Sequence, residues 1–134
     1  MNKRFLAVLT VLALICAPVP TIYAQQTTQC NNANQSAFAH ETLTVSTTAK
    51  ILTASVYNPG NGQLTATSAL VSIQGGQNVR VWFDGTAPTT SAGIVVKDGQ
   101  TVVVCGFPGL QKFQMIRDDG TDAEAAVQYF APAQ

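Results

Sequence analysis

Short runs in which apolar and polar residues alternate, each ended by turn residues, constrain this chain more than any other feature. Alternation places successive side chains on opposite faces of a strand, so that one face can be buried while the other stays in water. The clearest run covers residues 78–84, and it predicts Arg80, Trp82 and Asp84 on an outward face. The opposite, inward set is Val79, Val81 and Phe83.

Similar runs recur from residue 41 onward. We expect strands within residues 42–49, 50–57, 64–74, 78–84, 94–97, 101–105, 113–117 and 123–130. This spacing predicts an all-β fold: an antiparallel β-sandwich of seven to eight strands, either immunoglobulin-like or jelly-roll-like.

Turn signals separate these runs. Gly75-Gly76 and Asp98-Gly99 are typical of tight two-residue hairpins. The Phe107-Pro108-Gly109 stretch is expected to turn the chain. Residues 101–105 are rich in β-branched side chains, and we expect them to be buried on both faces of a sheet.

The N-terminus has the layout of an export signal. Two basic residues precede an apolar run over residues 5–17, which is followed by two prolines and by the small residue Ala24. The run is shorter than the roughly 20 residues that a membrane-spanning helix needs. We therefore expect residues 1–24 to be a signal peptide, residues 25–40 a polar N-terminal arm and residues 41–134 one sandwich domain in the periplasm or outside the cell.

The charge of the chain beyond the signal argues against one class of partner. Five basic and seven acidic residues follow residue 24, a net charge of −2. Nucleic-acid binding requires a basic stripe, which is missing from this sequence. No second apolar stretch is long enough to span a membrane. The expected partners are therefore a protein, further copies of the chain, or a glycan.

Cleavage of the signal leaves two cysteines, Cys30 and Cys105, because Cys16 lies inside the signal. Two cysteines in an exported domain are expected to form a disulfide, although two reduced and buried thiols are the alternative. The disulfide would close a loop of 76 residues, from 30 to 105 inclusive. A loop of this length is worth about 4 kcal/mol in the chain-entropy description.

Catalytic and metal-binding groups are scarce. His40 is the only histidine, no Gly-x-Ser-x-Gly motif accompanies it, and a disulfide would remove both thiols as nucleophiles. One histidine and two distant cysteines are too few for a usual zinc site. The acidic residues Asp118, Asp119, Asp122 and Glu124 lack the order of a calcium loop, and turn formation explains them better. We expect no enzyme activity, no metal and no cofactor.

Trp82 is the side chain most suggestive of binding. On the outward face it would lie between Arg80 and Asp84, which makes these three residues a candidate contact surface. An exposed indole can anchor a protein partner or stack on a sugar ring. Burial under a loop is the alternative, since large aromatic residues are usually buried.

The segment Val79-Arg80-Val81-Trp82-Phe83-Asp84-Gly85-Thr86-Ala87-Pro88-Thr89 resembles a strand and turn found in small β-sandwich proteins of tailed-phage virions. In that pattern an apolar strand enters Asp-Gly-Thr-x-Pro-Thr, and the later strands correspond here to residues 93–97, 113–117 and 123–130. A similar turn occurs in immunoglobulin-like accessory domains of surface glycosidases. Asp84, Gly85, Thr86 and Pro88 are then structural turn residues.

The resemblance implies a structural or decorating protein without catalytic activity. The expected signal peptide and cysteine pair depart from virion proteins that assemble in the cytoplasm. A domain of this type on the cell exterior reconciles both observations. We therefore expect an exported structural or adhesive module, virion-like or extracellular, that acts through surface contacts or assembly. The alternative is a carbohydrate-binding module that uses Trp82.

Overall fold

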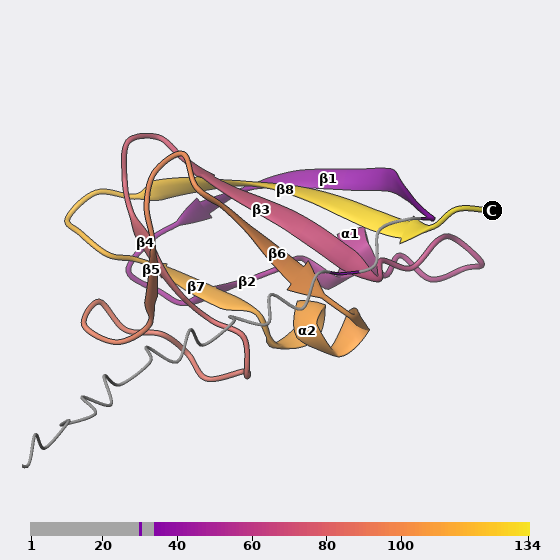
Figure 1. Ribbon diagram of the computed structural model, residues 1–134. Helices are drawn as coiled ribbons and strands as arrows, with labels where there is room; N and C mark the ends of the chain where they lie inside the picture. Colours follow the sequence, from indigo (N-terminus) through magenta and orange to yellow (C-terminus); the bar gives the residue numbers. More distant parts are fainter. Residues whose placement is uncertain (1–29, 31–33) are drawn as a thin grey trace, which may run out of the picture.

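The structure, a computed structural model, describes Cys30 and residues 34–134, which form eight strands and two short helices (Figure 1). The expected signal peptide lies outside the described residues. The strands are β1 (Gln35–Val45), β2 (Lys50–Ile51), β3 (Ser68–Gln74), β4 (Val79–Trp82), β5 (Ile94–Val96), β6 (Thr101–Cys105), β7 (Gln114–Arg117) and β8 (Ala123–Pro132). The helices are α1 (Ala54–Tyr57) and α2 (Phe107–Lys112).

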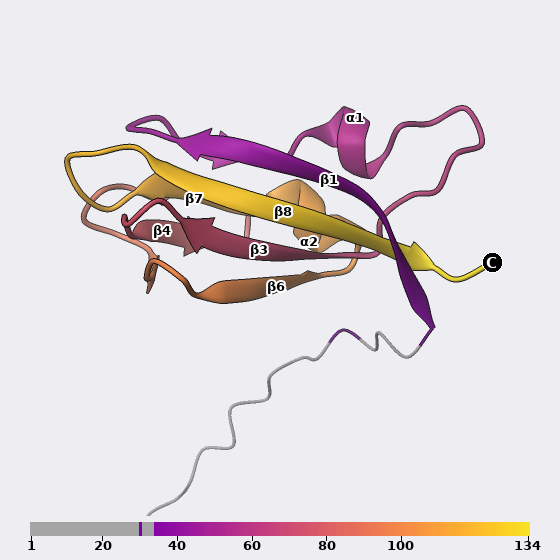
Figure 2. The same ribbon diagram turned by 90° about the horizontal axis from the view of Figure 1, so that it is seen from above.

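The strands build two four-stranded antiparallel sheets, which confirms the predicted β-sandwich. Sheet A has the order β1-β8-β3-β6, and sheet B has the order β2-β7-β4-β5. Figure 2 looks onto sheet A, whose four strands lie side by side. The first strand pairs with the last, the second with the seventh, the third with the sixth and the fourth with the fifth. Such a rolled-up hairpin is the connectivity of a jelly roll, one of the two expected topologies.

The two predicted tight hairpins are wrong. Gly75-Gly76 joins β3 to β4 and Asp98-Gly99 joins β5 to β6, and in each case the two strands belong to different sheets. Gly75, Gly76 and Gly99 do adopt positive φ angles, between 75° and 89°. A glycine marks where the backbone can turn sharply, but it does not specify which sheet the next strand joins.

Three local predictions need correction. Residues 50–57 form a two-residue strand and then the single turn α1, which places Tyr57 in the core. The expected turn at Phe107 is the start of α2, where Pro108 is tolerated in the first helical turn and Leu110 is buried. Residues 101–105 form an edge strand whose Val103 is 44% exposed, and are not buried on both faces.

The N-terminal boundary of the domain also differs from the prediction. β1 begins at Gln35, so residues 35–40 of the expected arm already pair with β8. A β-bulge between Ala37 and Ala39 shifts the register and breaks the alternation there. The polar composition of this stretch concealed the strand, because an edge strand with a solvated face needs few apolar residues.

The core lies between the sheets and is built from the inward-facing residues of both. In β8 every second residue from Ala123 to Ala131 is buried, and Val79 and Val81 of β4 are fully buried opposite them. The core also contains a buried polar group, the hydroxyl of Tyr129. The Tyr129 hydroxyl donates a hydrogen bond to Glu41 Oε1, which also accepts the backbone N–H of Thr53 at 3.0 Å. Burial, and then the Glu41 carboxylate, raise the pKa of Tyr129 above its ordinary value.

A disulfide joins Cys30 to Cys105 at the end of β6, as the sequence predicts, with the two Cα atoms 5.4 Å apart. Near it, Gln35 at the start of β1 bonds to two residues at the start of β3. The Gln35 amide donates to Thr67 Oγ1 at 2.9 Å and accepts from the hydroxyl of buried Ser68 at 2.6 Å. Cys30 is thereby attached to β6, and the start of β1 is attached to the start of β3.

Replacement of both cysteines, Cys30→Ser with Cys105→Ser, is expected to lower the free energy of unfolding by about 4 kcal/mol. The denatured chain regains the conformational freedom that the closed loop removes. Equilibrium urea denaturation measures the loss, and the wild-type chain in reductant serves as the control because it should lose a similar amount. A double variant as stable as the oxidised wild-type chain would contradict this role of the disulfide.

Candidate functional site

The predicted contact residues lie on the outer face of sheet B. Val79 and Val81 point into the core, so Arg80 and Trp82 between and after them point outward, and both are half-buried. Trp82 lies directly across from Gln114 of β7. The outward position predicted for Trp82 is therefore the one observed, and neighbouring side chains cover part of the indole. Asp84 is exposed and follows the end of β4.

Apolar side chains gather on and around this face. Ile51 of β2 is 55% exposed and lies across from Gln114, on the side away from Trp82. Val95 of β5 is 39% exposed and lies across from Arg80. Ile116 of β7 lies across from Arg80 on the other side and is buried. Ile51, Trp82 and Val95 all lie on this outer face, which we call the sheet B face.

The strand β4 ends two residues earlier than predicted, which changes the position of Phe83. Phe83 was expected to be buried with Val79 and Val81, but it is 38% exposed. Its ring packs on the buried ring of Phe113, with centroids 5.2 Å apart. The alternation stops at Trp82 because the chain bends there toward the Asp84 turn.

An internal ion pair neutralises the one cation on the sheet B face. Arg80 Nε lies 2.5 Å from Asp118 Oδ1, and the two side chains are 22% and 19% exposed. Arg80 Nη1 also donates to the carbonyl oxygen of Gly93 at 3.3 Å. Because its guanidinium is paired twice, Arg80 is fixed over the sheet, and the centre of the face has no net charge.

The acidic residues after β7 have structural partners. Asp118 pairs with Arg80, and Asp122 pairs with Arg117 at 2.8 Å. Asp119 accepts the backbone N–H of Thr121 at 3.3 Å, as a turn residue does. Within the described ranges, no three His, Cys, Asp or Glu residues lie close enough to share a metal ion. This arrangement agrees with the turn-forming role that the sequence suggests.

The Asp-Gly-Thr-x-Pro segment has the geometry of a structural turn. Asp84 Oδ1 accepts the backbone N–H of Thr86 at 2.9 Å, and Gly85 has a φ angle of 93°. The Thr86 N–H, and then the Thr86 hydroxyl, hold the pKa of Asp84 below its ordinary value. Pro88 is buried, and the Gln114 amide, which lies across from Trp82, donates to the Gly85 carbonyl at 2.7 Å.

A shallow groove of about 380 Å³ lies on the outer face of sheet A. It is lined by His40, Thr42, Leu70, Ser72, Thr101 and Gln128 among others. The Gln128 amide donates to the Ala39 carbonyl at the bulge of β1, at 2.7 Å. His40 is exposed on β1, at the opposite edge of the sheet from β6 and Cys105. The lining combines the apolar residues Leu70, Ala126 and Val127 with polar side chains and the carboxylate of Glu41. Trp82 lies on the other side of the sandwich.

Sequence reasoning missed that Ile51, Val95 and Ile116 occupy outward positions in sheet B. The sequence contains a pattern that indicates these outward positions, namely adjacent large apolar residues within a strand. Neighbouring residues of a strand point to opposite faces, so adjacent large apolar residues require one of them to face outward. Ile51-Leu52, Val95-Val96 and Met115-Ile116 are three such pairs, and all belong to strands of sheet B or directly follow one.

Comparison with known proteins finds no relative of this chain. No family model, no curated protein and no solved structure matches this chain. No helix among the described residues has the length and apolar character to cross a membrane. The function must therefore be argued from the faces of the sandwich themselves.

Replacement of Gly93 should disturb the sheet B face through a steric clash. A Cβ atom at Gly93, which has a φ of 139°, would lie 2.9 Å from the Arg80 Cβ and 3.3 Å from the Pro88 Cβ. We expect Gly93→Ala to cost about 2–3 kcal/mol in the free energy of unfolding. Gly60→Ala is the matched control, because Gly60 has a φ of 71° but open space around it, and should cost about 1 kcal/mol. Equal losses in urea denaturation would refute the steric argument.

Proposed function

We propose that this protein is an exported, non-catalytic structural or adhesive module that acts through contacts of its surface with a protein partner or with further copies of itself. The observation that supports it is the distribution of exposed apolar side chains. Of five large hydrophobic residues that are exposed in the described chain, Ile51, Ile94 and Val95 belong to sheet B and Phe83 follows its strand β4. Ile51 and Val95 share the outer face of sheet B with the half-buried Trp82, and exposed apolar side chains that share a face are typical of a contact site.

The positions of the chemically reactive residues support a non-catalytic role. Cys30 and Cys105 are joined in a disulfide, so neither offers a free thiolate. His40 lies on the opposite edge of sheet A from Cys105. A nucleophile and its base must lie within hydrogen-bonding distance of each other, and this pair does not.

The topology supports the same proposal. Jelly rolls are the fold of many viral capsid proteins and lectins, which act by assembly or by binding. This agrees with the resemblance of the Val79–Thr89 segment to β-sandwich proteins of phage virions. The fold is shared by proteins of many functions, so the surface is the stronger support. The cysteine pair and the expected signal peptide favour the periplasm, the cell exterior or an exported virion-like structure.

Photocrosslinking in exporting cells tests this function. We expect a photoreactive phenylalanine analogue in place of Ile51 to form a covalent adduct with the molecule that contacts the sheet B face, either a protein partner or a second copy of the chain. The same analogue in place of Thr44, which is exposed on sheet A, is the control and should give no adduct. The adduct should contain a chain that begins at Gln25 and lies outside the cytoplasm. An unreacted Ile51 variant, or a chain with an intact leader in the cytosol, would contradict the proposal.

Carbohydrate binding is a second candidate because the partly exposed indole of Trp82 lies beside the amide of Gln114. An aromatic ring next to a hydrogen-bonding side chain can stack on a sugar and bond to its hydroxyls.

A glycan array tests this candidate with three proteins. If Trp82 is the sugar platform, the wild-type chain should bind, Trp82→Ala should lose at least about tenfold in affinity, and Trp82→Phe should retain most of it because a ring remains. Absence of binding by the wild-type chain, or equal binding by wild type and Trp82→Ala, removes this function.

A further inference from the structure

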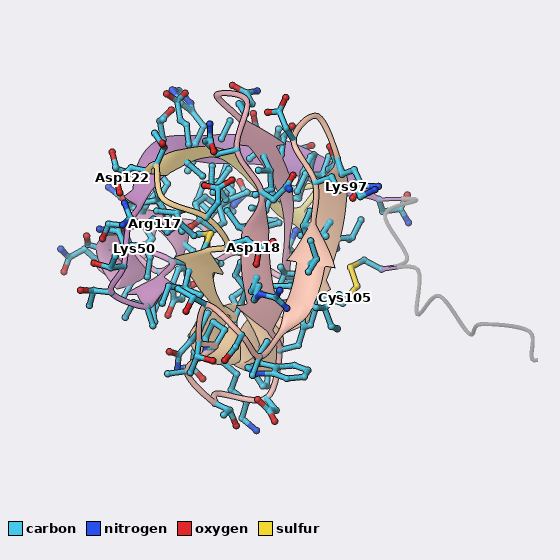
Figure 3. The ribbon with its side chains drawn as sticks, turned by 90° about the vertical axis from the view of Figure 1, so that its left-hand side faces the viewer. Lys50, Lys97, Cys105, Arg117, Asp118 and Asp122 are labelled. Carbon is cyan, nitrogen blue, oxygen red and sulfur yellow. A yellow bond between two sulfur atoms is a disulfide. The ribbon has the colours of Figure 1, made fainter. Side chains whose placement is uncertain are left out.

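The edge strands β5 and β6 lie on the same side of the sandwich and are unusually apolar. β5 ends sheet B and β6 ends sheet A. Three of the five exposed large hydrophobic residues belong to them: Ile94, 51% exposed, Val95, 39%, and Val103, 44%. Neither strand contains a charged residue, and Lys97 is the first one after β5. Figure 3 shows Lys97 and Cys105 on this side, with Lys50, Arg117 and Asp122 on the opposite side.

The pairing of β6 with β3 determines which backbone groups point away from sheet A. Ser68 lies opposite Cys105 and Ser72 opposite Thr101. Beyond the two ends of this ladder, the N–H of Gly106 bonds to the Thr67 carbonyl and the N–H of Ile73 bonds to the Gln100 carbonyl. Hydrogen-bonded pairs alternate along an antiparallel ladder, so Val102 and Val104 bond to β3. The backbone N–H and C=O groups of Thr101 and Val103 therefore point outward from the edge.

The same argument applies to β5 in sheet B. The N–H of Asp118 bonds to the Asn78 carbonyl, which places the hydrogen-bonded pairs between β4 and β7 at Arg80 and Trp82. Val79 and Val81 then bond to β5, and the backbone groups of Val95 point outward from the edge. Among the described residues, nothing pairs with the outward backbone groups of Thr101, Val103 and Val95, which lie on one side of the molecule. Ile94 beside them is exposed although its partner Val81 is buried.

The opposite side of the sandwich is protected. β1 has a bulge between Ala37 and Ala39, and α1 packs near it. The Ser46 carbonyl, just after β1, accepts the N–H of Arg117 in the other sheet. Bulges, charges and covering segments are the usual means by which proteins prevent edge-to-edge pairing. β6 is regular over its five residues and has neither a charge nor a proline.

We propose that β6 pairs antiparallel with β6 of a second copy of this chain, about a two-fold axis at Val102, so that sheet A continues through both molecules. In this register Thr101 lies opposite Val103 of the second copy. Their outward N–H and C=O groups then close two hydrogen bonds at each of the two symmetry-related pairs. Cys105 and its disulfide lie two residues beyond Val103 and outside this central contact.

A second copy is the occupant that the charge pattern favours. Strand pairing about a two-fold axis brings each residue near its own equivalent, so any charge in the strand would meet a like charge. Residues 101–105 contain none. The same axis brings the exposed Ile94 and Val95 of both molecules toward each other, which removes apolar surface from water. This inference rests on the proposed assembly role and names one contact in that role.

Sedimentation equilibrium of the exported chain tests the contact. The wild-type chain is expected to show a monomer–dimer equilibrium. Val103→Lys should weaken dimerisation at least about tenfold, because it places a charge in the centre of the contact. Val103→Pro should do the same, and it removes an N–H that has no partner in sheet A, so the fold is retained. Thr44→Lys on the edge strand β1 is the matched control and should dimerise as the wild type does.

Three results would overturn the pairing: a wild-type chain that stays monomeric up to ~1 mM, a Val103→Lys variant that dimerises as well as the wild type, or a dimer that only Ile51→Lys disrupts. The last result would place the self-contact on the sheet B face and would leave the proposed function intact. Crosslinking at Ile51 is independent of the Val103 variants. A failure of the β6 contact and a failure of the proposed function are therefore distinguishable.

Discussion

Burial of every second residue of β8 is the constraint on which the rest of the structure depends. β8 is ten residues long, lies between β1 and β3 in sheet A, and pairs with both. Its inward row from Ala123 to Ala131 is at most 2% exposed. A shift of one residue in its register would move this row into water and would bring Glu124 and Gln128 into the core, so both neighbours are held in one register. Tyr129 in the same row supplies the hydroxyl that satisfies Glu41.

The outward rows of the two sheets define what the molecule presents to its surroundings. On sheet A the outward residues include Thr42, Ser72 and Gln128, together with the apolar Leu70 and the exposed Val103. On sheet B they include Ile51, Trp82 and Val95, and the paired Arg80 adds no net charge at the centre. A β-sandwich needs only its inner faces to be apolar for stability. The exposed Ile51 and Val95 are therefore not required by the sandwich itself, and they are the basis of the proposed contact function.

Edges present a separate problem from faces. The β1 side is closed by a bulge, a helix and a hydrogen bond between the layers, whereas β5 and β6 end their sheets with valine and isoleucine. A monomer that avoids association usually places lysine or proline at such an edge. Side-by-side pairing at β6 and face contact at sheet B use different surfaces, so one molecule can engage in both. The two proposed contacts together would suit an extended assembly.

The sequence by itself determined the periodic features of this protein: the presence of strands β4 and β8, the outward position of Trp82, the Asp84 turn and the Cys30–Cys105 pair. These follow from alternation, from glycine at positive φ and from the presence of only two cysteines after the expected signal. Only the tertiary structure decided which sheet each strand joins, that β6 is an edge, that residues 54–57 turn into a helix, and that Ile51 and Val95 share a face. Those outcomes depend on contacts between residues far apart in the chain, such as Val103 with Leu70 or Ile51 with Gln114, and local patterns do not encode them.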